Sequence, residues 1–322
     1  MPVKFYKQST PVVKGVILII IANTFFAINM PVSRELTPIW INPLGLSLLR
    51  ISFAFIAFFL MSKIMKVKDN FTIKEHISLV ICGITGTSLN QLTFLLGLSM
   101  SSPVDASLII TGGPIVTMLF SALFLKERIS LMKTIGVLVG LSGALLILYS
   151  SYIGSAINTT GSLKGNLIVV ISVFSYATYL ITVPSLMQKH SPVNVMKWTF
   201  FYGMITSLPF CYKYTGLTDG YGLTQVLELA YALIFGTFIA YTLVAFALQL
   251  LSPTTVSMFN YMQPVIASTI AIAIGQDILH WLKPVSALLI FSGVYLVVNA
   301  ERLKRYLANI QNLIKKSFAT IF

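Results

Sequence analysis

A few polar side chains lie deep inside long apolar runs of this sequence, where each must face protein or water instead of lipid. Arg50 follows Pro43 by seven residues, which places it about 10 Å into a helix that begins there. A charge at that depth costs at least about 2.5–3.5 kcal/mol on insertion scales. Its guanidinium can be the counter-ion of an anionic or carboxylate-bearing solute. The alternatives are that it reaches the membrane surface or clamps backbone carbonyls at a helix end.

Amides and phenols lie at similar depth in other apolar runs. Asn29 and Tyr179 fall at equivalent positions of an internal repeat, described below, and so do Gln91 and Tyr241. Adjacent helical residues point about 100° apart, so we expect only one of Asn90 and Gln91 to face a cavity. Hydrogen bonding between helices is the alternative role for these groups. The candidate solute-binding residues are Asn29, Arg50, Gln91, Tyr179, Tyr241, Asn260 and Gln263.

Two prolines at equivalent positions, Pro114 and Pro264, interrupt apolar runs and break the helical hydrogen-bond ladder. Each frees the carbonyl four residues earlier, which belongs to Ile110 in one run and to Asn260 in the other. Transporters place solute sites at broken helices near mid-membrane, so these carbonyls can line a solute path. A kink that serves only packing is the alternative.

Asp105 is the one acid inside the apolar boundary of the first half, which makes it a candidate for proton coupling. The preceding Ser102 and Pro103 are typical of a helix start. A capping role is therefore the alternative for Asp105.

The sequence contains no pattern that indicates an enzyme or a resident cofactor. It has no HExxH, no GxSxG, no phosphate-binding loop and no pair of intramembrane aspartates. It also has no Cys and His cluster at metal-ligand spacing, so we expect no metal. Its two cysteines, Cys82 and Cys211, are expected to be small apolar core residues and not a disulfide. An intramembrane enzyme is the weakest of the functional alternatives.

The composition is that of a membrane protein, because 56% of the 322 residues are hydrophobic and only 10% are charged. A helix needs about 20 mostly apolar residues to cross the hydrocarbon core. Ten such stretches lie near residues 15–33, 43–62, 76–99, 103–125, 134–151, 165–183, 193–212, 228–249, 253–274 and 284–300. The predicted fold class is therefore an all-α integral membrane protein with ten transmembrane helices.

The second half repeats the first at a constant offset of 150 residues. The offset takes Ser102-Pro103 to Ser252-Pro253, Gly86-Thr87 to Gly236-Thr237, and Glu127 to Asp277. Each half holds five apolar stretches, and an odd number makes the second half start on the opposite side of the membrane. We therefore expect two inverted repeats with a solute site where they meet.

Basic residues predict the orientation. With the N-terminus in the cytoplasm, 17 of the 22 Lys and Arg residues fall in inside segments and four in outside segments. Both termini are then cytoplasmic, in a multi-pass protein of the inner membrane. The net charge of +13 reflects this topology and does not indicate nucleic acid.

The expected domain organisation places the two repeats at 15–151 and 164–300. Segments 1–14 and 152–163 are an N-terminal cytoplasmic segment and an extracytoplasmic linker. Residues 301–322 have apolar residues at helical spacing with basic residues between, which predicts an amphipathic helix on the lipid surface. Gly136, Gly140 and Gly143 form a close-packing face, either within the monomer or in a homodimer.

Several motifs resemble those of the drug/metabolite transporter superfamily, specifically the EamA-type ten-helix exporters. They are Phe26-Ala27-Ile28-Asn29 with the later Arg34, Leu49-Arg50, and the turn Leu125-Lys126-Glu127-Arg128-Ile129-Ser130 before a glycine-rich helix. The spacing from Ser-Pro to Pro also recurs in both halves. The resemblance implies export of amino acids, nucleosides or related small metabolites through a central cavity. A passive facilitator for such solutes is the main alternative.

Overall fold

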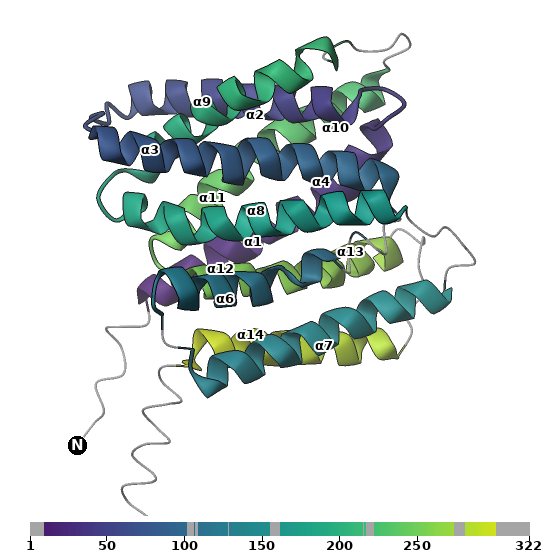
Figure 1. Cartoon of the computed structure of the whole chain (residues 1–322). Helices are drawn as coiled ribbons and strands as arrows, with labels where there is room; N and C mark the ends of the chain where they lie inside the picture. Colours follow the sequence, from purple (N-terminus) through teal and green to yellow (C-terminus); the bar gives the residue numbers. More distant parts are fainter. Residues whose placement is uncertain are drawn as a thin grey trace, which may run out of the picture.

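The computed structural model describes residues 10–101, 106, 109–127, 129–154, 162–214, 216, 222–273 and 281–300. Helices are the only extended regular elements within these residues, and they lie side by side (Figure 1). The first repeat holds α1 (Thr10–Leu36), α2 (Pro43–Ile64), α3 (Ile73–Cys82), η1 (Gly83–Ser88), α4 (Leu89–Met100), α6 (Gly113–Phe124) and α7 (Leu131–Gly154). The second repeat holds α8 (Leu163–Met187), α9 (Pro192–Cys211), η2 (Tyr212–Tyr214), α10 (Leu223–Leu233), η3 (Ile234–Ile239), α11 (Ala240–Leu248), α12 (Pro253–Met258), η4 (Phe259–Tyr261), α13 (Met262–Ala273) and α14 (Leu282–Val298).

Local sequence signals account for several helix starts. Asn42 caps α2 by accepting a hydrogen bond from the Leu44 amide at 3.0 Å, and Pro43 occupies the first turn, where no donor is lost. Thr72 and Glu75 form a reciprocal capping box at the start of α3. These caps fix the points at which the chain re-enters the apolar layer.

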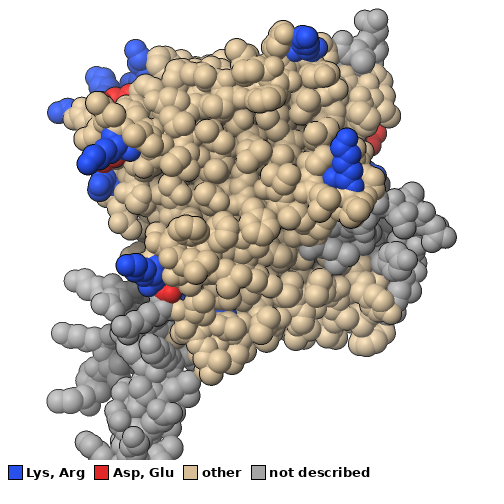
Figure 2. All heavy atoms as spheres, in the orientation of Figure 1, with Lys and Arg blue, Asp and Glu red and all other residues tan. Residues whose placement is uncertain are grey.

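Length and composition make this an integral membrane fold. Five helical segments are long and apolar enough to cross a membrane: Pro11–Leu36, Pro43–Ile64, Ile73–Met100, Leu163–Met187 and Leu223–Leu248. Shorter apolar helices cover Ile109–Phe124, Leu131–Leu146 and Leu282–Val298. On the face in Figure 2, charged residues gather at the helix ends and leave an uncharged band between them. This band is what the hydrocarbon layer requires.

The packing of the helices shows the relation between the two repeats. α2 packs on α9 and α7 on α14, and each of these pairs joins equivalent elements of the two repeats. α6 packs on α12, and these two helices belong to the equivalent fourth and ninth transmembrane segments. The contact of α4 with α8 is matched by that of α11 with α1. Exchanging the two halves therefore maps the packing onto itself, as a two-fold axis does. The predicted architecture, ten transmembrane segments in two inverted five-helix repeats, is confirmed.

Glycines let α7 and α14 approach closely inside one chain. A Cβ on Gly136 would lie 2.8 Å from the Gly293 carbonyl oxygen, and a Cβ on Gly143 would lie 2.7 Å from that of Ser286. The 150-residue offset converts one contact into the other. The glycine face of α7 thus packs within the monomer.

Both cysteines are free and buried, as predicted. The amphipathic tail predicted for 301–322 lies outside the described residues, and so do residues 155–161 of the linker and the N-terminal residues 1–9.

Candidate solute-binding site

A cavity of about 140 Å³ lies between the two repeats. One water needs about 10–15 Å³ on this scale, so the space matches about ten waters or a solute of about ten non-hydrogen atoms. α1, α2, α4 and α6 contribute lining residues from the first repeat, and α8, α11, η4 and α13 contribute them from the second. Six candidate residues meet in its wall: Asn29, Arg50, Gln91, Tyr241, Asn260 and Gln263.

Arg50 supplies the charge of the cavity wall. Its side chain is buried on α2; Nε donates to the Thr237 hydroxyl at 2.8 Å, and Nη2 donates to the Gly236 carbonyl at 3.2 Å. Within the described part of the chain no carboxylate lies within ion-pair distance of Arg50. Its positive charge is therefore balanced there only by neutral dipoles.

The side-chain amides of Gln91 and Asn29 have polar atoms available for a ligand. Among the described residues, neither the Gln91 side-chain amide nor Asn29 Oδ1 has a partner at full hydrogen-bond geometry. The Tyr241 phenol is the polar group that interacts with Gln91. Buried polar groups are normally paired, so these atoms can receive a ligand. Gln263, in contrast, donates from Nε2 to Asn23 Oδ1 at 2.8 Å and thereby ties α13 to α1.

Aromatic and apolar side chains make up much of the remaining wall. Phe26 packs edge-on against Tyr241, with ring centroids 5.6 Å apart, and Phe94 and Tyr176 line other parts of the cavity. The site therefore combines one cation and several amides with apolar surface, which suits a small amphipathic solute.

Tyr179 does not line the cavity, unlike the other six candidates. Its side chain is fully buried, and its hydroxyl contacts Met196 Sδ at 3.5 Å. The ring lies over Gly86, as Asn29 lies over Gly236 in the other repeat. Repeat equivalence thus holds for the position, but a large ring fills the space where Asn29 leaves room. Tyr176, one turn earlier on α8, lines the cavity instead.

Asn90 also lines the cavity together with Gln91, contrary to the expectation that only one of them would. The cavity surrounds enough of α4 for the side chains of both Asn90 and Gln91 to face it, and Phe94 of the same helix also lines it. Asn90 donates from Nδ2 to the Ser172 carbonyl at 3.0 Å, so it also joins α4 to α8. Ser172 and Thr117 are further lining residues that polarity alone did not single out.

Both predicted helix breaks lie beside the cavity. In the first repeat a turn at Gly112 precedes α6, which carries Pro114 in its first turn. In the second repeat the 3₁₀ segment η4 precedes Pro264 in α13. Ile110 and Asn260, the residues four positions before the two prolines, both line the cavity.

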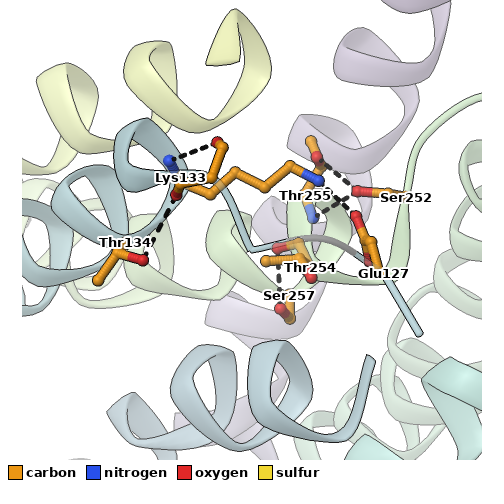
Figure 3. Close-up of polar contacts among 8 residues, drawn as sticks. Glu127, Lys133, Thr134, Ser252, Thr254, Thr255 and Ser257 are labelled. Carbon is orange, nitrogen blue, oxygen red and sulfur yellow. Dashed lines mark hydrogen bonds and ion pairs between the residues drawn. The ribbon is translucent and has the colours of Figure 1, made fainter. Parts of the chain in front are cut away.

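The cavity ends before the connection between α6 and α7. There Lys133 and Glu127 form an ion pair close to Thr254, at the start of α12 in the other repeat (Figure 3). The lining residues of α6 stop at Thr117, and Met118, one residue further, lies beside the ion pair. Packing of α6 against α12 therefore closes this end.

Asp105, the candidate for proton coupling, lies outside the described residues. Among the described residues no group of three or more His, Cys, Asp or Glu could hold a metal ion.

Ten apolar helical segments in inverted repeats around a polar cavity define a multi-pass membrane transporter. The sequence matches the EamA-like transporter family over residues 13–149 and 163–299, once in each repeat. The chain belongs to this family, within the drug/metabolite transporter superfamily.

Similar proteins occur in an archaeon, a bacterium and a plant. An uncharacterized transporter of Archaeoglobus fulgidus is 27% identical over 85% of this chain and 93% of its own length. The uncharacterized inner membrane transporter YicL of Salmonella typhimurium is 25% identical over 70% of this chain and 73% of its own. Protein WALLS ARE THIN 1 of Arabidopsis thaliana is 24% identical over 91% of this chain and 82% of its own. A solved crystal structure with 16% identity aligns with a TM-score of 0.70 over 90% of this chain and 98% of that one, which supports the fold.

Proposed function

We propose that this protein is a secondary transporter that exports small carboxylate-bearing solutes, amino acids or close relatives, by alternating access across the inner membrane. The observation that carries the proposal is the position of Arg50 in the wall of a cavity between the repeats. No carboxylate among the described residues forms an ion pair with it. A solute carboxylate supplies the missing anion, because guanidinium and carboxylate geometries match in a two-pronged hydrogen bond.

The neutral groups of the wall fit the rest of such a solute. The Asn29 amide oxygen has no partner among the described residues, and it can accept a hydrogen bond from an ammonium group together with the amide oxygen of Gln91. Phe26, Phe94 and Tyr176 offer apolar surface to a side chain. The volume of about 140 Å³ offers room for a small solute of this kind.

The inverted repeats provide the mechanism. Because exchanging the halves maps the packing onto itself, the same contacts can be made with the opposite end of the cavity open. The distribution of Lys and Arg supports a cytoplasmic location of the Glu127–Lys133 end and of both termini. In this conformation the cytoplasmic end is then the closed one.

The test is counterflow in proteoliposomes, with radiolabelled L-leucine, L-phenylalanine and L-glutamate as probes. We expect Arg50→Gln to raise KM at least about thirtyfold, since losing one partner of a buried charge pair costs about 2–5 kcal/mol and 1.4 kcal/mol is tenfold. The matched control is Lys197→Gln. It removes another buried cation, one that pairs with Asp69 away from the cavity, and it should leave KM unchanged.

An Arg50→Gln protein that transports the probes with the parent's KM would refute the assignment of the site. Uptake driven by an imposed pH gradient separates coupled export from passive facilitation, because a facilitator only equilibrates the probe. If Asp105 couples protons, Asp105→Asn will abolish gradient-driven uptake and retain counterflow.

A further inference from the structure

The two groups that hold Arg50 lie on η3, the π-helical segment Ile234–Ile239 in the middle of the eighth transmembrane segment. A π-helical turn widens the hydrogen-bond ladder, and such turns often occur at functional sites. Here the Gly236 carbonyl accepts from Arg50 Nη2, and the Thr237 hydroxyl accepts from Arg50 Nε. Arg50 is thus attached to the second repeat although it belongs to the first.

The hydrogen bonds of Thr237 fix which way its hydroxyl points. A hydroxyl has one proton, and Thr237 donates it to the Ala232 carbonyl at 2.7 Å. Only the lone pairs of Oγ1 remain for Arg50, at 2.8 Å from Nε. Thr237 is therefore oriented as an acceptor, which suits a permanently charged donor.

A guanidinium is planar, with five N–H donors in a rigid fork. Nε and Nη2 are occupied by Thr237 and Gly236, and they form one edge of this fork. The end of the fork, one N–H each from Nη1 and Nη2, has no partner among the described residues. The hydrogen bonds to Thr237 and Gly236 fix the plane of the guanidinium. Its free end can then bind both oxygens of a carboxylate.

We propose that Thr237 is a positioning residue for solute recognition: it holds Arg50 so that the free end of the guanidinium binds the solute carboxylate. This inference rests on the proposed function. It adds that selectivity for carboxylates depends on a residue that does not line the cavity.

The first repeat contains an equivalent π-helical segment, but no arginine lies at the position equivalent to Arg50. Its π-helical segment η1 carries Gly86 and Thr87, and Thr87 donates to the Gly83 carbonyl at 2.6 Å. The position equivalent to Arg50 is Phe200, which is fully buried and cannot donate to Thr87. The fold therefore does not require the contact between Arg50 and Thr237, and Thr87 is a matched control.

The first experiment measures counterflow of L-leucine and competition by L-leucinamide, which lacks the carboxylate. We expect Thr237→Val to raise KM for leucine about tenfold, the effect of one hydrogen bond to a charged group, and to leave the maximal rate unchanged. The preference for leucine over leucinamide should fall by the same factor. Thr237→Ser should restore both values, and Thr87→Val should match the parent. A Thr237→Val protein with the parent's KM and preference would overturn the inference.

A second measurement needs no solute. Thermal unfolding of the parent, Arg50→Gln, Thr237→Val and the double variant in detergent forms a double-mutant cycle. We expect the Tm shifts to be non-additive, since each single substitution breaks the same hydrogen bond; additive shifts would overturn the contact. If the parent transports none of the probes, the proposed function fails, and this cycle still decides whether Thr237 holds Arg50.

Discussion

Gly86 and Gly236 are equivalent glycines whose substitution by alanine should have different consequences. A Cβ on Gly236 would lie 2.2 Å from Asn29 Oδ1, and a Cβ on Gly86 would lie 2.3 Å from the ring of Tyr179. Ordinary contacts of this kind measure 3.4–4 Å, so either neighbour must move by more than about 1 Å. The two collisions are alike in size, and the neighbours differ in their freedom to move.

The Asn29 side chain is short and lies at the cavity wall, so its amide can rotate into open space, and a small shift of α1 must relieve the remaining 3.0 Å contact with Asn29 Cβ. We expect Gly236→Ala to cost about 1 kcal/mol, the lower end for overpacking, and alanine recovers about 0.5–1 kcal/mol of helix propensity. The Tyr179 ring is fully buried against its neighbours and has no space to enter. Gly86→Ala should therefore destabilise by about 3 kcal/mol, the upper end of that range.

Thermal unfolding in detergent and counterflow in proteoliposomes distinguish the two effects. Gly86→Ala should lower Tm clearly and leave KM of the remaining folded protein unchanged. Gly236→Ala should keep Tm close to that of the parent and raise KM, because the displaced Asn29 amide occupies solute space. Equal losses of Tm in the two variants, or an unchanged KM for Gly236→Ala, would refute this account of the cavity wall.

Two further predictions concern packing away from the cavity. Gly293→Ala should destabilise by about 3 kcal/mol in thermal unfolding, because its Cβ would lie 2.5 Å from backbone atoms of α7 and the helices must separate; Ser142→Ala on the exposed face of α7 should have no effect. Lys133→Ala should cost about 1–3 kcal/mol by leaving the half-buried Glu127 carboxylate without its cation. The added substitution Glu127→Ala should recover part of this loss, and a double variant as unstable as the single one would contradict the ion pair's role.

The sequence was sufficient for the architecture because its two strongest signals are physical. Apolar length determines which segments cross the membrane, and the constant offset of 150 residues relates the halves. Depth within the apolar runs and equivalence between repeats were also enough to select Asn29, Arg50, Gln91, Tyr241, Asn260 and Gln263, which the structure brings to one cavity.

What the sequence could not predict depends on side-chain volume and on local backbone geometry. Tyr179 satisfies the same rules as Asn29, yet its ring fills the space over Gly86 and the cavity lies elsewhere. The π-helical segment around Thr237 was not predicted, because its Gly236-Thr237 pair, which recurs as Gly86-Thr87 in η1, indicates the repeat and not a widened turn. The partner of Arg50 therefore emerges only when both repeats are packed together.

The repeats share a scaffold and differ in the side chains placed on it, and the proposed function accounts for this difference. Two states of similar energy require equivalent packing, which the α2–α9 and α7–α14 contacts provide. A solute with one carboxylate has no two-fold symmetry, so a symmetric pair of cations would leave one of them buried and unpaired in every state. Phe200 is the repeat equivalent of Arg50, and Tyr179 is that of Asn29, so the scaffold stays equivalent while only the first repeat supplies a charge to the cavity wall. The proposed transport of an asymmetric solute thus accounts for a cavity wall that differs between the repeats and for helix contacts that do not.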